Sequence, residues 1–173
     1  MYNDELYIKI YQLLNKSTPI RTDCGKLCGK ACCRGSDEEL GMYLFPEEQN
    51  LLKKACFLKI SETELSYRPG KNVFFASCNG NCDRSWRPLA CRIFPLTPYL
   101  TAKDLLIIKN DPRAFSICPL AKQSYRSGLD SVFIRNVRNG CRELLLYEET
   151  KTFLRWLSEL LDECSNPNKY FLN

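Results

Sequence analysis

Apolar residues recur at helical spacing at both ends of the chain. Between residues 3 and 15 they return every three or four positions, which predicts an amphipathic helix. The same period runs through Leu129–Leu146 and Glu149–Cys164 and predicts two closing helices. Pro46 opens another helical pattern, whose apolar face extends to Cys56. These helices are expected to supply the core.

Strand patterns are weaker and lie in the middle of the chain. Glu64–Tyr67 and Asn72–Ala76 flank a Pro-Gly turn, which predicts a small hairpin. Leu105–Ile108 has the composition of a short buried strand. Residues 23–36 show neither period and are rich in Cys, Gly and Lys, so we expect a loop there.

We therefore expect a mainly α fold: a small single domain over residues 1–173, with cysteine-rich metal-binding loops and at most a minor β-hairpin. A chain of 173 residues is long enough to bury its own core. Within it, the metal-binding region is expected at about 20–120 and a helical region at about 129–164.

Composition indicates a soluble globular protein, with 45% hydrophobic and 26% charged residues. No run approaches the ~20 apolar residues that span a bilayer, so no membrane association is expected. Residues 1–14 have neither a basic n-region nor an apolar h-region. The sequence thus predicts a cytoplasmic location, where structural disulfides are rare and cysteines are free to bind metal.

Eleven cysteines and no histidine set this chain apart. The absence of histidine excludes Ser-His and Cys-His catalysis and histidine-ligated zinc. Paired carboxylates such as Glu47-Glu48 stand at helix starts, where the helix dipole or solvation explains them. No catalytic group is indicated, and we do not assign an enzyme.

Four cysteines fall within ten residues of the glycine-containing loop: Cys24, Cys28, Cys32 and Cys33. Zinc and iron-sulfur centres need several converging thiolates, and close spacing lowers the entropy lost in gathering them. Adjacent side chains generally point in different directions, so one of Cys32 and Cys33 is expected to serve a second site or the core.

A second group contains Cys78, Cys82 and Cys91, with Cys118 as the fourth expected ligand. The sequence therefore predicts eight metal ligands in two segments. The other three cysteines, Cys56, Cys141 and Cys164, each stand alone in a predicted helix and are expected to be ordinary buried thiols.

Two arginines, Arg87 and Arg92, flank the Pro88–Cys91 stretch. We expect them to donate hydrogen bonds to metal-bound sulfurs, although pairing with carboxylates or with an anionic substrate is an alternative. The formal net charge of +5 counts cysteines as neutral. Eight thiolates add −8 and two divalent ions add +4, which lowers the net charge to +1. A basic excess therefore does not indicate a nucleic-acid partner.

The cysteine pattern resembles the YkgJ-like family of zinc- or iron-chelating domains over roughly residues 20–120. The resembling residues are Cys24-x3-Cys28-Gly29-x2-Cys32-Cys33 and Cys82-x3-Trp86-Arg87-Pro88-x2-Cys91-Arg92-x-Phe94-Pro95. The chain departs from the CxxCxxCC hallmark by one inserted residue in each gap, and it has Trp86 where a tyrosine is common. The resemblance implies metal binding without naming the metal.

The expected function is non-catalytic chelation of zinc or an iron-sulfur cluster by cysteine thiolates. One alternative is an iron-sulfur enzyme for methyl transfer or redox chemistry, because the flagellin lysine-N-methylases look similar around these cysteines. The chain lacks the C-x3-C-x2-C spacing of radical S-adenosylmethionine enzymes and a glycine-rich nucleotide loop. Another alternative is a thiol redox switch without metal. The expected partners are the metal ion and an unidentified protein.

Overall fold

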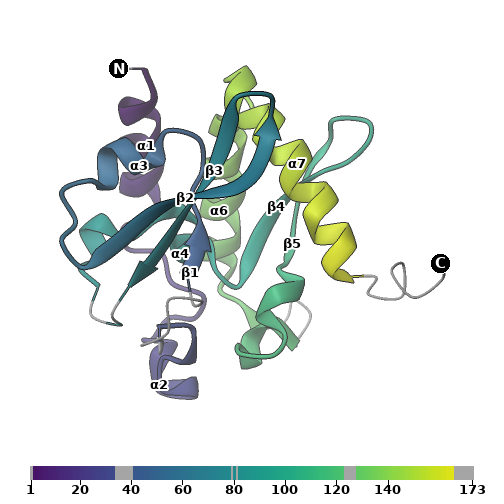
Figure 1. The fold of residues 1–173 in the computed structure, drawn as a ribbon. Coiled ribbons are helices and arrows are strands. Elements are labelled where there is room, and N and C mark those ends of the chain that lie inside the picture. The colour runs from purple at the N-terminus through teal and green to yellow at the C-terminus, as the bar shows by residue number, and fades with distance from the viewer. Residues whose placement is uncertain (1, 34–40, 79, 81, 123–127, 166–173) are drawn as a thin grey trace, which may run out of the picture.

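The structure is a computed structural model that describes residues 2–33, 41–78, 80, 82–122 and 128–165. Helices and strands are interspersed along these residues, which form a mixed α/β domain (Figure 1). In chain order the elements are α1 (Tyr2–Leu14), α2 (Gly25–Cys28), η1 (Ala31–Cys33), β1 (Gly41–Tyr43), α3 (Glu48–Leu52), β2 (Leu58–Arg68), β3 (Lys71–Cys78), η2 (Arg84–Trp86), α4 (Leu89–Ile93), β4 (Leu96–Leu100), β5 (Leu106–Asn110), η3 (Pro112–Ala114), η4 (Pro119–Lys122), α6 (Ser131–Leu144) and α7 (Glu148–Ser165).

Two antiparallel sheets organise the middle of the chain. One has the order β1-β3-β2, and the other pairs β4 with β5. The predicted hairpin is confirmed and is longer than expected, because β2 pairs with β3 from Leu58 opposite Cys78 to Arg68 opposite Lys71. Gly70 has a φ of 73° at the turn, a conformation that favours glycine. The β3 strand ends at Cys78, so the sheet delivers that thiol to the site.

The prediction of a mainly α fold is wrong, and two features of the strands explain the error. Most side chains of β2 are exposed or half-buried, so the strand lacks the alternation of apolar and polar residues that identifies a one-sided sheet. In β4, Pro98 interrupts a run that otherwise reads as a strand, and a proline argues against a sheet position. The predicted strand near Leu105 is confirmed as β5, but the expectation that it is buried is wrong, because Ile108 is its one buried residue and Ile107 is exposed.

The terminal helices are confirmed as α1, α6 and α7. The helix after Pro46 is shorter than predicted, because α3 ends at Leu52 and Cys56 lies in a turn. The described part of the predicted cysteine loop contains the single-turn helix α2 and the 3-10 turn η1, while residues 34–36 of that prediction lie outside the described residues. Within the described residues, no helix combines the length and apolarity needed to cross a bilayer.

The buried side chains of these elements form one hydrophobic cluster. Phe153 of α7 lies at its centre, with its ring 5.3 Å from that of Phe45 and 5.2 Å from that of Trp156. On the other side, α1 packs against α6 (Figure 1). The cysteine loop with α2 extends from this body beside β1 (Figure 1). The cysteines of the second group are thus attached to the packed core, whereas those of the first group lie on the loop outside it.

Gly140 sets the close approach of α6 to α1. A methyl group added there would lie 3.0 Å from Ile10 Cγ2. Valine has no room in this contact, so Gly140→Val is expected to lower the free energy of unfolding by about 1–3 kcal/mol. Urea denaturation measures this change. Asn139→Val, at an exposed position of the same helix, is the matched control, and equal destabilisation by both variants would contradict a packing effect.

Candidate metal centre

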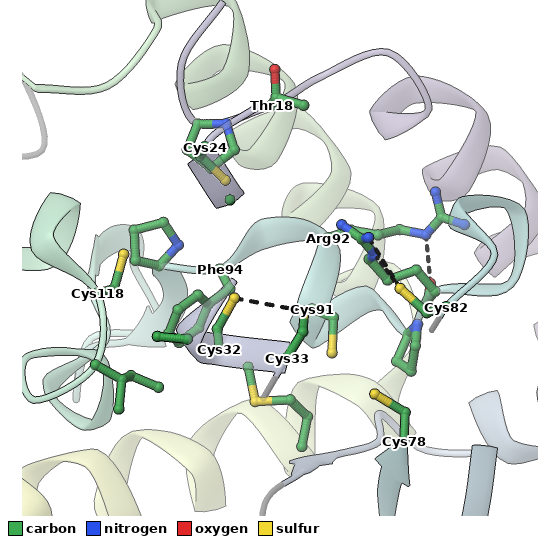
Figure 2. Close-up of a pocket in the computed structure, with 18 of the residues that line it drawn as sticks. Thr18, Cys24, Cys32, Cys33, Cys78, Cys82, Cys91, Arg92, Phe94 and Cys118 are labelled. Carbon is green, nitrogen blue, oxygen red and sulfur yellow. Dashed lines mark hydrogen bonds between the residues drawn. The ribbon is translucent and has the colours of Figure 1, made fainter. Parts of the chain in front are cut away.

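A cavity of about 210 Å³ lies between the cysteine loop and the body of the domain (Figure 2). All eight cysteines selected from their spacing line it: Cys24, Cys28, Cys32, Cys33, Cys78, Cys82, Cys91 and Cys118. They come from α2 and its N-terminal flank, η1, the end of β3, the segment before η2, α4, and the turn after η3. The fold therefore brings the two predicted cysteine groups to a single site.

The local backbone of the cysteine loop turns sharply twice. Gly29 adopts the left-handed conformation with φ 56° and ends α2, and Lys30 follows with φ 60°. The Lys30 N–H donates to Gly25 O, which closes the α2 turn. This reversal carries the chain directly from α2 into η1, so thiols from both turns face the same cavity.

Cys32 and Cys33 lie closer together than expected. Their Sγ atoms are 3.8 Å apart, so the prediction that the two side chains point apart is wrong, because the η1 turn brings both to one side. The contact with the Cys32 thiol lowers the pKa of Cys33 to about 6, with Arg87 and Lys30 adding to the effect. The same contact, with burial, raises the pKa of Cys32. The loop thus holds two thiols in contact, and either sulfur can donate to the other.

Arg87 binds the sulfur of Cys82. Its Nε and Nη2 donate to Cys82 Sγ at 3.3 and 3.1 Å, the contact expected of a donor to a thiolate. This guanidinium also lowers the pKa of Cys33. Arg87 is therefore placed to offset the negative charge of several sulfurs at once.

Arg92 has a different role from the one predicted. Its guanidinium donates to three carbonyl oxygens, those of Arg84, Ser85 and Arg87, and stacks 3.9 Å above the Tyr11 ring. Its Nη1 has no hydrogen-bond partner among the described residues. Arg92 thus ties the η2 turn to α4, and within the described part of the chain its hydrogen bonds go to carbonyl oxygens and not to sulfur.

Cys91 and Cys118 are presented from opposite sides of the cavity. Cys91 lies on α4, where burial raises the pKa of its thiol. Cys118 is buried just after η3, and its backbone N–H donates to Ala114 O. Cys24, at the start of α2, has its pKa raised by burial and by the neighbouring Asp23, Cys118 and Cys28.

Glu48 is a site residue that the sequence did not reveal. Its carboxylate is fully buried and accepts hydrogen bonds from the Tyr11 hydroxyl at 2.5 Å, Leu89 N at 2.6 Å and Phe45 N at 3.1 Å. Burial raises the pKa of Glu48. The bond to Leu89 N holds the first turn of α4, and Cys91 lies on that helix. The prediction of a solvated or dipole-bound carboxylate is wrong at this position, because tertiary packing encloses it.

Arg84 was also missed. Its guanidinium donates to Leu14 O at 3.4 Å, Asn15 O at 2.7 Å and Ser17 O at 2.5 Å, which satisfies carbonyls at the end of α1. The η2 segment is thereby fixed to the first helix. Arg84 stands two residues after Cys82, and nothing in the sequence indicates which helix end it would bind.

The three remaining cysteines are not among the described residues that line the cavity. Cys141 is buried in α6, as predicted, and burial raises its pKa to about 12. Cys56 and Cys164 are exposed, so the prediction of buried thiols is wrong for these two. Cys56 falls beyond the end of α3, and Cys164 lies in the exposed last turn of α7.

The donor set at the cavity fits a thiophilic metal. All eleven cysteines are free, and eight face one partly apolar space that Phe94, Ile117 and Met42 also line. Among the described residues, no three Cys, Asp or Glu side chains converge closely enough to hold an ion in the present arrangement. The thiols surround a common space without meeting at one point, so metal binding requires their side chains to turn inward.

Comparison of the chain with protein families, with curated proteins and with solved structures finds no match.

Proposed function

We propose that the protein binds zinc or an iron-sulfur cluster through cysteine thiolates, as a non-catalytic module of the YkgJ-like type. The observation that carries the proposal is the common position of eight cysteines from distant segments around one cavity. Burial of ordinary thiols does not require them to gather in one place. Zinc and iron-sulfur centres do require it.

Two further features support thiolate ligation. The Arg87 guanidinium donates to Cys82 Sγ, and the contact with Cys32, together with Arg87 and Lys30, lowers the pKa of Cys33 and so favours the thiolate that binds metal. The thiols are all free, which is compatible with the cytoplasmic location that we propose. A metal held by four or more thiolates supplies structural cross-linking or, as a cluster, electron transfer.

Anaerobic purification followed by elemental analysis and an absorption spectrum tests the proposal. We expect stoichiometric zinc in a colourless protein, or iron and sulfide in a brown protein that absorbs near 400 nm. The Cys141→Ala variant is the matched control, since that thiol is buried away from the cavity, and it should keep the full metal content. A protein that never binds metal, while its thiol count changes reversibly with oxidant, would instead identify a redox switch.

A further inference from the structure

We propose that the eight thiols form two adjacent four-cysteine centres, each built from both cysteine segments. The first centre contains Cys24, Cys28, Cys32 and Cys118, and the second contains Cys33, Cys78, Cys82 and Cys91. The inference rests on the proposed metal-binding function and adds to it the number of centres and their ligand sets.

The first set gathers around α2. Cys28 Sγ lies 4.0 Å from Cys24 O, one helical turn away. The thiols of Cys118 and Cys28 act electrostatically on Cys24, and those of Cys28 and Cys24 act on Cys32. In Figure 2, Cys24, Cys118 and Cys32 occupy the left side of the cavity. Cys118 therefore belongs with the loop cysteines, although it follows the second group by sequence.

The second set gathers around α4 and Arg87. The thiols of Cys33 and Cys78 act electrostatically on that of Cys91, and Figure 2 draws both next to it. Arg87 binds Cys82 directly, and the same guanidinium acts on Cys33 and Cys91. Figure 2 shows Cys78 and Cys82 on the right side of the cavity, with Cys91 and Cys33 between them and Cys32. One arginine thus serves three of the four sulfurs of this centre.

Cys32 and Cys33 form the junction between the two sets. Their sulfurs are in contact at 3.8 Å, so the centres adjoin. Cysteines that share one zinc ion are typically separated by two to four residues, which allows the chain to fold around the ion. Consecutive cysteines lack these intervening residues, so binding of both to one ion would close a tight chelate ring. Division of the pair between two ions avoids that ring.

Double variants in the full-length chain distinguish this pairing from its alternatives. The apo protein is loaded with zinc alone and challenged with a chelator at a concentration that spares only four-thiolate sites. Wild type is expected to keep two ions per chain. Cys24→Ser with Cys118→Ser removes two ligands from one centre and should keep one ion. Cys91→Ser with Cys118→Ser damages both centres and should keep none.

Each other result overturns the proposed pairing in a recognisable way. If each centre came from one segment, the first double variant would lose both ions and the second would keep one. If all eight thiols held one cluster, both double variants and the Cys24→Ser single variant would lose all of their bound zinc. A wild type that keeps one ion also contradicts two centres, whereas a wild type that holds neither zinc here nor iron and sulfide after anaerobic purification refutes the proposed function itself. Ions are counted per folded chain after gel filtration, with Cys141→Ala as the control that keeps two.

Discussion

Replacement of Glu48 by alanine is expected to lower the free energy of unfolding by about 3–5 kcal/mol. The change leaves three buried donors without their acceptor: the Tyr11 hydroxyl, Leu89 N and Phe45 N. Each unsatisfied buried donor costs about 1–3 kcal/mol, and relaxation or entering water recovers part of the total. Denaturation in urea, monitored by circular dichroism, measures the loss.

Two further variants test whether the loss of stability comes from the hydrogen bonds of Glu48, from its charge or from its position in the chain. Glu48→Gln keeps one acceptor oxygen but turns an amide N–H toward a backbone N–H, so it should fall between wild type and alanine. Glu47→Ala changes the neighbouring, half-buried carboxylate and should cost less than Glu48→Ala. If the two alanine variants were equally stable, the buried network would not be what holds α4.

The cysteines could be selected from sequence because their chemistry is carried by residue type and spacing. Close spacing separated the eight cavity thiols from Cys56, Cys141 and Cys164, and the structure places those eight around one cavity. The orientation of Cys32 and Cys33 could not be predicted in the same way. It depends on the 3-10 turn that follows Gly29, and consecutive residues specify no such turn by themselves.

The sequence predicted part of the hairpin and β5, but it did not reveal β1, β4 or the full length of β2, because the signal for these strands is not local. Helices α6 and α7 bury one continuous stripe, so periodicity reveals them. The β2 strand is mostly exposed, and its pairing with β3 stabilises it. Its own sequence therefore shows little of the apolar and polar alternation that predicts a strand. Glu48 illustrates the same limit, since only the approach of α1 and α4 encloses its carboxylate.

Removal of the metal is expected to lower the melting temperature by about 8–16 °C. Free metal at a thousandfold excess over its Kd stabilises the folded state by about 4 kcal/mol. In a chain of this size, each kcal/mol corresponds to about 2–4 °C. Differential scanning calorimetry before and after verified removal measures the shift. An unchanged melting temperature would contradict a metal that organises these loops.

The loss of stability should be largest in the cysteine loop, because metal ligation is expected to hold the loop, whereas hydrophobic packing holds the body of the domain. The loop around α2 and η1 contributes no buried residues to the core, whereas α6 buries Phe133, Val137 and Leu144. Hydrogen exchange should therefore become fastest at the α2, η1 and η2 amides of the apo protein, whereas amides in the middle of α6 should accelerate only by as much as the global free energy of unfolding falls. The Cys24→Ser, Cys91→Ser double variant is the control: it lacks a ligand in each proposed centre, so chelator should change neither its exchange nor its melting temperature.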